Sequence, residues 1–307
     1  KSDRPFFLHV CYTAPHYPLH AKPKDIQKYV GKFRMGWDKM RRQRHARMVK
    51  MGLIDPKWKL SDSDSRAYDW ASANQEHEDL RMAVYAAMID SMDQNIGRLM
   101  ASLHESGEAD NTLVLFLSDN GGCAEEPGGR SPKIVPGPKE FYAAVGPSWG
   151  WAQNAPFRRY KSWAHEGGIA TPCIAWWPGH VPTGVITKEV GHIIDFLPTF
   201  LELAGGVYPE KHNGQEIIPV EGKSLVKILR GGTREGHKQL AWEWSGNRAL
   251  REGRWKVVWD KLEKKWSLFD LEADRTETND LAEVNAALAK RLAGQWSEWA
   301  AMTGLRR

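Results

Sequence analysis

A histidine held between two prolines is the first residue of this chain whose setting suggests chemistry. His16 lies in the stretch FLHVCYTAPHYPLHA, between Pro15 and Pro18 and directly after an apolar run. An imidazole in such a place can donate a hydrogen bond to an anion or protonate a leaving group. Taken alone, the pattern favours a structural histidine whose hydrogen bonds are satisfied in a turn between a strand and a loop.

An acid and an amide follow a second apolar run. Asp119 and Asn120 lie near the end of the stretch NTLVLFLSDNGG, just beyond a segment with the pattern of a buried strand. Carboxylate and amide oxygens suit a hard cation such as calcium, which takes six to eight oxygen ligands at about 2.3–2.6 Å. The spacing alone favours the simpler alternative, an Asp-Asn-Gly turn that binds nothing.

A lysine close to two glycines is the third candidate. Lys161 follows two arginines and lies five residues before the Glu-Gly-Gly step at 166–168. Its ammonium can bind an anionic group, although a run of charges is usually a solvated face. Two consecutive glycines indicate a backbone that passes close to other atoms or takes positive φ.

Strands must place these residues at one edge of a sheet. Phe6–Tyr12 has the pattern of a buried strand, with His16 just past its carboxyl end, and NTLVLFL ends shortly before Asp119. A third apolar strand is predicted at Cys173–Trp177. Because open α/β sheets bind ligands beyond the carboxyl ends of their strands, the candidates are expected to converge there.

Helices are predicted between these strands. Apolar residues recur every three or four positions from Arg81 to Leu103, as in a helix that packs on a sheet, and Gly107 ends it. A second helix in IIDFLPTFLELAGG is expected to end at Gly205. The alternation predicts an α/β fold with a mostly parallel sheet flanked by helices.

The remaining segments differ in amino-acid composition and pattern. The basic residues 22–81 read as an insertion, and the Pro- and Gly-rich loop 123–157 carries Trp149 and Trp151, which favours a pocket wall. After residue 205, KQLAWEWSGNRALREGRWKVVWDKLEKKWSLFDL predicts an antiparallel meander, closed by a helix at 286–300. We therefore predict a larger α/β domain at 1–205 and a smaller α+β subdomain at 206–307.

Composition narrows the class of protein. The 307 residues include 43 basic and 38 acidic side chains, and this net charge of +5 fits an anionic substrate as well as nucleic acid. The three cysteines lie far apart, so their spacing indicates neither a zinc site nor a disulfide framework. No apolar stretch approaches the ~20 residues that a membrane span requires.

Several motifs together resemble, in order and spacing, the type I sulfatases of the alkaline phosphatase superfamily, and most closely the bacterial arylsulfatases. The resemblance covers nearly the whole chain, and residues 32–66 are its least diagnostic part. The motifs that carry it are PFFLHVCYTAPHYPLHA, AAMIDSMDQNIGRLMASL, NTLVLFLSDNGG, YKSWAHEGGIATPCIAWWPG, IIDFLPTFLELAG, NRALREGRWKVV and FDLEADRTETNDLA.

The resemblance implies roles for the candidate residues. His16 corresponds to a ligand of the sulfate group near the leaving oxygen, and Lys161 to the lysine that contacts the sulfate and helps to protonate the leaving group. Asp119 and Asn120 correspond to two ligands of the family's calcium ion, with magnesium as the alternative. The implied partner is a sulfated small molecule or glycan, and the family suggests a periplasmic or secreted location.

One family motif is absent from the chain. Sulfatases carry a formylglycine made from a cysteine or serine in a C-x-P-S-R motif, and neither Cys11, Cys123 nor Cys173 has that context. We therefore predict that this chain is the C-terminal portion of a sulfatase, without turnover on its own. Two metal ligands are too few for calcium, so weak binding at best is expected.

Other functions stay open at this point. A phosphodiesterase or phosphonate hydrolase of the same superfamily shares metal ligands of this kind, and a degenerate homologue could bind a sulfated glycan without hydrolysis. Nucleic-acid binding ranks last, because the run KMRRQRHARMVK fits a solvated helix face better than a phosphate-binding patch. The sequence gives no prediction of oligomeric state.

Overall fold

The computed structural model describes residues 4–305, which form two compact units. The first unit contains the chain up to Ser102 together with residues 120–170 and 276–278. The second contains residues 103–119, residues 171–275 and the chain from Asn279 onward. The domain boundary that the sequence predicts after residue 205 is a different division of the chain, and it stays a prediction.

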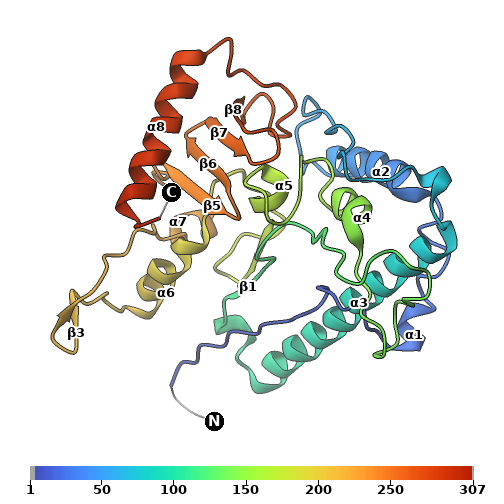
Figure 1. Ribbon diagram of the computed structural model, residues 1–307. Coiled ribbons are helices and arrows are strands. Elements are labelled where there is room, and N and C mark those ends of the chain that lie inside the picture. The colour runs from blue at the N-terminus through green and yellow to red at the C-terminus, as the bar shows by residue number, and fades with distance from the viewer. Residues whose placement is uncertain (1–3, 306–307) are drawn as a thin grey trace. The chain divides into compact units, whose positions relative to one another are not determined.

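The first unit is helical. Its longest helix confirms the predicted helix, but the predicted stripe is buried only as far as Met88, and Leu99 is exposed. The helix ends directly before Gly107, whose φ of +76° favours glycine. The helix α2 contains the whole basic run KMRRQRHARMVK (Figure 1). The helices that begin in this unit are α1 (Pro23–Ile26), α2 (Gly36–Lys50), the 3-10 turn η1 (Trp70–Ser72), α3 (Gln75–Ser106), α4 (Gly146–Gln153) and α5 (Glu166–Ile169).

Tryptophans form the core of this unit. Trp37 of α2 and Trp149 of α4 meet edge to face with ring centres 5.5 Å apart. The prediction that Trp149 and Trp151 line a pocket is wrong, since they are 0% and 2% exposed. Burying these large rings stabilises the fold more than lining an open wall would. Arg41 of the basic run is buried too, 3.5 Å above the Trp151 ring.

A four-stranded antiparallel sheet covered by one helix forms part of the second unit. Strands β5 to β8 pair in sequence order, which confirms the predicted meander. Leu250, Val257 and Leu268 pack against Leu292 and Trp296 of α8, which lies along the sheet (Figure 1). The elements are β5 (Leu240–Trp244), β6 (Asn247–Glu252), β7 (Trp255–Asp260), β8 (Lys265–Asp270) and α8 (Ala286–Met302).

The other elements of the second unit precede this sheet. Helix α6 confirms the predicted helix and ends at Gly205 in the left-handed conformation, with φ 64°. These elements are η2 (Ala109–Asn111), β1 (Val114–Leu117), β2 (Cys173–Trp176), η3 (Ile193–Asp195), α6 (Phe196–Ala204), β3 (Lys211–His212), β4 (Gln215–Glu216) and α7 (Val226–Leu229).

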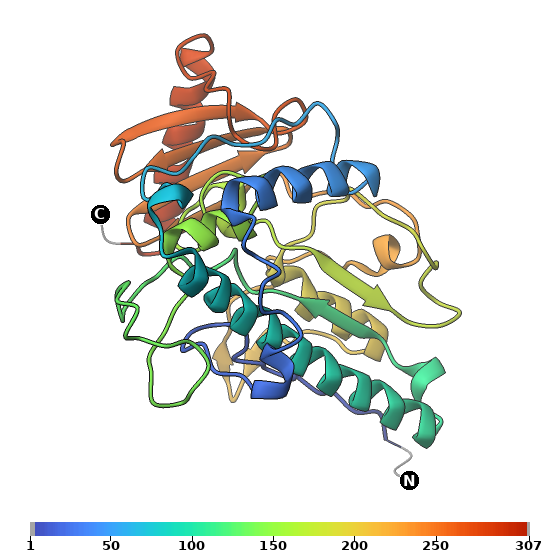
Figure 2. The same cartoon turned by 90° about the vertical axis from the view of Figure 1, so that its right-hand side faces the viewer.

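The predicted parallel sheet is not seen among residues 4–305. Strands β1 and β2 lie side by side as an antiparallel pair, with Leu115 opposite Ala175 (Figure 2). Residues 5–13 belong to no strand, and Phe7 is 74% exposed, so the prediction of a buried strand there is wrong for this chain. An apolar run is buried only where neighbouring strands cover it, and its own pattern cannot supply them.

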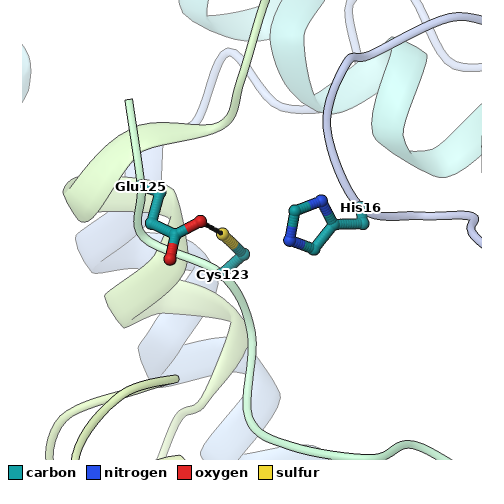
Figure 3. Close-up of side chains that lie close together, drawn as sticks. All are labelled: His16, Cys123 and Glu125. Carbon is teal, nitrogen blue, oxygen red and sulfur yellow. Dashed lines mark hydrogen bonds between the residues drawn. The ribbon is translucent and has the colours of Figure 1, made fainter. Parts of the chain in front are cut away.

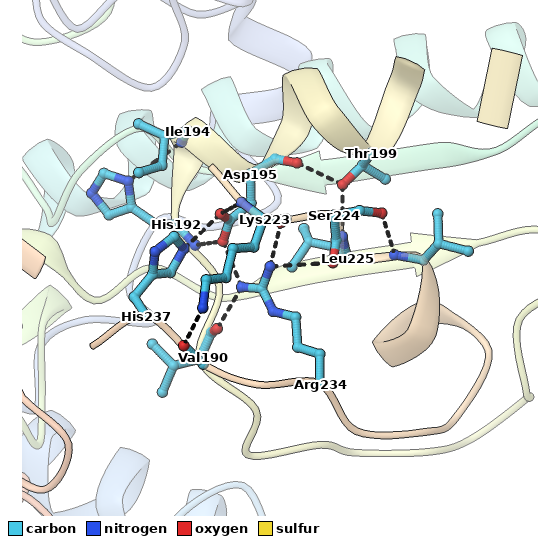
Figure 4. Close-up of polar contacts among 12 residues, drawn as sticks. Val190, His192, Ile194, Asp195, Thr199, Lys223, Ser224, Leu225, Arg234 and His237 are labelled. Atoms are coloured by element: carbon cyan, nitrogen blue, oxygen red, sulfur yellow. Dashed lines mark hydrogen bonds and ion pairs between the residues drawn. The ribbon is translucent and has the colours of Figure 1, made fainter. Parts of the chain in front are cut away.

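A buried carboxylate organises the region around α6 in the second unit. Asp195, fully buried, accepts hydrogen bonds from Arg234 (2.7 Å), from His237 Nε2 (2.7 Å) and from the backbone N–H groups of His192 and Lys223 (2.8 Å each). Figure 4 shows these donors converging on it from separate segments. Burial disfavours the charge, but these hydrogen bonds outweigh burial and lower the pKa of Asp195.

Candidate active site

His16 and Lys161, 145 positions apart in sequence, meet in the first unit. Lys161 Nζ lies 2.9 Å from His16 Nε2. Because an ammonium can only donate, Nε2 must accept and the ring proton must sit on Nδ1. Nδ1 is 2.9 Å from the backbone carbonyl of Tyr17, to which it then donates. The imidazole is thus held in one tautomer by a backbone carbonyl and a cation.

A carboxylate completes the cluster. Glu125 Oε2 accepts a hydrogen bond from Tyr17 Oη at 2.6 Å and lies 3.4 Å from Lys161 Nζ. The bond from Tyr17 is the main reason why the pKa of Glu125 is lowered, and the same bond raises the pKa of Tyr17 to about 12. At neutral pH the carboxylate is therefore ionised beside Lys161 and the phenol keeps its proton.

Cys123 lies at the edge of this cluster. Its thiol is half-buried and donates a hydrogen bond to Glu125 Oε2 at 3.5 Å. Burial is the main cause that raises the pKa of Cys123 to about 11. The sulfur is therefore a thiol at neutral pH, which gives no support to a role as nucleophile.

Main-chain hydrogen bonds fix the loop that carries Glu125 against the segment that carries Lys161. The Lys161 N–H donates to the Gly122 carbonyl at 3.1 Å, and the Gly121 N–H donates to the Gly168 carbonyl at 3.0 Å. The Asn154 side chain accepts from the Gly122 N–H at 2.9 Å. These contacts thus fix the backbone of Lys161 next to the backbone of Gly121 and Gly122.

The glycines of these two segments allow the close approach. A Cβ on Gly121 would lie 1.8 Å from the Gly167 carbonyl oxygen, and one on Gly168 would lie 2.0 Å from the Trp163 carbonyl oxygen. Neither Gly167 nor Gly168 takes positive φ. The sequence predicted either close approach or positive φ at the Glu-Gly-Gly step. The structure confirms the first alternative, a backbone that passes close to other atoms.

Gly121→Ala is expected to destabilise the chain by about 1–3 kcal/mol, because a backbone carbonyl cannot move aside as a side chain can. Gly97→Ala is the matched control: Gly97 lies in α3, and a methyl group added there would have nothing within 4 Å. Alanine there should raise stability by up to about 1 kcal/mol. Urea unfolding of both variants measures the two effects, and equal losses would contradict the close-approach explanation.

A buried aspartate positions the turn directly before Lys161. Asp64 accepts a hydrogen bond from Arg159 Nη1 at 2.9 Å and one from Tyr160 Oη at 3.1 Å. Arg159 and Ser162, on either side of Lys161, both have positive φ, at 65° and 75°. Such backbone conformations are costly outside glycine and concentrate at functional sites. The contacts of Asp64 help to hold this turn.

Of the two predicted cation ligands, only Asn120 belongs to the same unit as this cluster. Asn120 is half-buried in the first unit and donates through Nδ2 to the Gly121 carbonyl at 2.7 Å; its Oδ1 is the atom of the type that binds a cation. Asp119 is exposed and belongs to the second unit. The donors fit calcium in type, since both are hard oxygens, but two oxygens are fewer than the six to eight that it takes.

Comparison with models of protein families shows to which family the chain belongs. The family model described as "Sulfatase" matches residues 1–207, and the model "N-sulphoglucosamine sulphohydrolase, C-terminal" matches residues 158–299. The chain belongs to the sulfatase family. This places it in the alkaline phosphatase superfamily, as the motif resemblance predicted.

Curated sulfatases extend the match. The chain is 31% identical to an uncharacterized sulfatase of Schizosaccharomyces pombe, over 99% of this chain and 59% of that protein. It is 32% identical to an arylsulfatase of Klebsiella aerogenes, over 78% of this chain and 54% of that protein. The chain thus spans little more than half the length of these sulfatases.

Solved structures share the fold at lower identity. The crystal structure of "Ps i-CgsB in complex with k-i-k-neocarrahexaose" has a TM-score of 0.63 and 23% identity, over 97% of this chain and 51% of that one. The phosphonate monoester hydrolase of Silicibacter pomeroyi has a TM-score of 0.54 and 18% identity, over 98% of this chain and 56% of that one.

Among residues 4–305, none of the helices is both long and apolar enough to cross a membrane.

Three residues of this candidate site, Tyr17, Asp64 and Glu125, escaped the sequence analysis. Tyr17 and Glu125 meet across 108 positions, and Asp64 and Arg159 across 95. Glu125 lies in a Pro- and Gly-rich stretch and Asp64 in a serine-rich one, so neither has a pattern that marks it. Only Tyr17 had a hint, because it directly follows His16.

Proposed function

We propose that this chain supplies the sulfate-binding and proton-donating side of a sulfate monoester hydrolase. The observation that carries the proposal is the 2.9 Å contact between Lys161 Nζ and His16 Nε2 in a chain of the sulfatase family. The substrate class is a sulfated small molecule or glycan. Both groups are accessible, since His16 is exposed and the Lys161 side chain is 21% exposed.

The hydrogen-bonding capacity of Lys161 supports this role. Its ammonium has three donors, of which one faces His16 and one faces Glu125. The third can bind a sulfate oxygen, where a positive charge stabilises the negative charge that builds up as the ester bond breaks. When that bond breaks, the leaving oxygen takes a proton from the Lys161–His16 pair.

Two further groups belong to the proposal. Asp119 and Asn120 would hold part of a calcium site, with magnesium as the alternative, and a bound ion would add positive charge next to the sulfuryl oxygens. Their two oxygens alone are too few, so further ligands are needed. The formylglycine nucleophile is likewise expected outside this chain, which contains no C-x-P-S-R motif.

A mostly parallel sheet that includes β1 and β2 is a further part of the proposal. Phe116 of β1 is 41% exposed and Ile174 of β2 is 60% exposed, although both lie in apolar strands. Strands of a longer protein that cover these residues would complete a mostly parallel sheet. Covering exposed apolar surface contributes about 25 cal/mol per Å², which supports such an arrangement.

The proposal is tested by comparing two proteins. The 307-residue chain alone is expected to release no more sulfate from an aryl sulfate than its Lys161→Ala variant does. The product of the whole gene that contains the chain is expected to hydrolyse the ester. Turnover by the wild-type chain well above that of its variant would contradict the need for an external nucleophile.

The same assay separates the alternatives. A phosphonate monoester and a phosphodiester are offered beside the aryl sulfate, because the fold is shared with a phosphonate monoester hydrolase. A higher kcat/KM for either phosphorus substrate would overturn the sulfate proposal. Binding of a sulfated glycan with no hydrolysis of any ester would favour the non-catalytic homologue instead.

A further inference from the structure

Three side chains with different metal-binding atoms converge in the candidate active site. His16, Cys123 and Glu125 place an imidazole nitrogen, a sulfur and a carboxylate oxygen within 4.8 Å of one another. Figure 3 shows the His16 ring facing Cys123 and Glu125, which come from the segment after Asn120. All three belong to the first unit.

This set of atoms matches the ligand preferences of zinc. Zn²⁺ binds imidazole, thiolate and carboxylate, and sites with three protein ligands keep a fourth position open. His16 is also oriented as zinc-binding histidines are, because its Nδ1 faces the Tyr17 carbonyl and its Nε2 points into the cluster. The Asp119 and Asn120 oxygens are hard ligands and belong to a different class of site.

A cation of the protein already sits among these atoms. The Lys161 ammonium lies 2.9 Å from His16 Nε2 and 3.4 Å from Glu125 Oε2, two of the three atoms that a metal would use. Lysine is a flexible point charge that can withdraw along its four-carbon stem. An ammonium and a metal ion therefore compete for the same two atoms.

We propose that His16, Cys123 and Glu125 bind Zn²⁺ in exchange for the Lys161 ammonium. A zinc–sulfur bond forms, the S–H bond breaks, and the thiol proton passes to solvent. Zinc bound there occupies the place where Lys161 and His16 would meet a sulfate ester. Only this inhibitory consequence rests on the proposed function; the binding itself does not.

Cobalt titration of the reduced 307-residue chain tests the site, because Co²⁺ replaces zinc and gives a thiolate charge-transfer absorption. We expect that absorption in the wild type, its loss on adding Zn²⁺, and its absence in Cys123→Ser. Cys11→Ser and Cys173→Ser should keep it. Cys11 is the critical control, because its sulfur lies 3.4 Å from His9 Nε2 and forms a second thiol–imidazole pair.

Two further variants test the competition and guard against misfolding. Lys161→Met should tighten cobalt binding about tenfold, the effect of removing one charged hydrogen-bonding competitor. Glu125→Gln should weaken binding while the sulfur absorption remains. Absence of the absorption in the wild type, its persistence in Cys123→Ser, its loss in Cys11→Ser, or no tightening in Lys161→Met would each overturn the proposal.

The outcome is separable from that of the proposed function. If zinc-free whole protein hydrolyses sulfate esters and cobalt gives no absorption, only the zinc site is lost. If cobalt binds through Cys123 and no sulfate ester is hydrolysed, the zinc site stands and the sulfate proposal is lost. With both correct, added Zn²⁺ inhibits hydrolysis, and this inhibition is weaker in Cys123→Ser.

Discussion

Replacing Lys161 by alanine is expected to lower kcat for sulfate ester hydrolysis by the whole protein about 10²- to 10⁴-fold, the usual range for a general acid. The variant removes the ammonium that lies 2.9 Å from His16 Nε2 and its hydrogen bond to the imidazole. It also removes a positive charge from the place where the ester is expected to lose its leaving group.

Two substrates distinguish proton donation from simple anion binding. If Lys161 helps to protonate the leaving oxygen, an alkyl sulfate, whose leaving group is poor, should lose more rate than a nitrophenyl sulfate. Lys188→Ala is the matched control, because Lys188 is exposed and lies outside the cluster. Equal losses of rate for both substrates would show that Lys161 only binds the sulfate. A loss in Lys188→Ala as large as that in Lys161→Ala would show that Lys161 has no specific role in the reaction.

Asp195→Asn is expected to cost about 3–5 kcal/mol of stability, the usual effect of breaking a buried ion pair from one side. Arg234 and Asp195 are 5% and 0% exposed, so the guanidinium would lose its charged partner away from water. The new amide group would also face donors such as His237 Nε2 or the backbone N–H groups of His192 and Lys223.

Urea unfolding at neutral pH measures this loss. Glu252→Gln is the matched carboxylate-to-amide control, because Glu252 and Arg291 form an exposed pair, and such pairs contribute about 0–1 kcal/mol. Acid unfolding provides a second measurement of the contribution of Asp195. Since folding lowers the pKa of Asp195, its contribution is present above the unfolded value of 3.8 and is lost as the pH falls through the folded value. Asp195→Asn should therefore be less sensitive to acid than the wild type.

Local patterns predicted the helices and the meander well. The stripe from Val84 to Leu103 identified α3, and alternation with glycine turns identified β5 to β8, because both periods are properties of the segment itself. Gly167 and Gly168 were correctly taken as a sign of close backbone approach. The two periods depend on neighbours in sequence, whereas the glycine pair indicates a close approach without indicating that Gly121 is the partner.

Features that depend on distant partners could not be predicted. The apolar run at Phe6–Tyr12 looks the same whether or not other strands cover it, and only the structure shows that Phe7 is exposed here. Trp149 and Trp151 looked like pocket residues because the loop had no period, yet they pack in the core. Glu125 was missed because its partners Tyr17 and Lys161 are brought to it by the fold.

The bonds between Gly121 and Gly168 and between Gly122 and Lys161 use main-chain atoms only. Side chains next to them, such as Tyr17 and Glu125, can therefore change without moving the Lys161 backbone. Such an arrangement lets the side chains around Lys161 vary while the Lys161 backbone stays in place. The glycines allow this close backbone contact, so we expect tolerance to mutation to be low at 121 and 168.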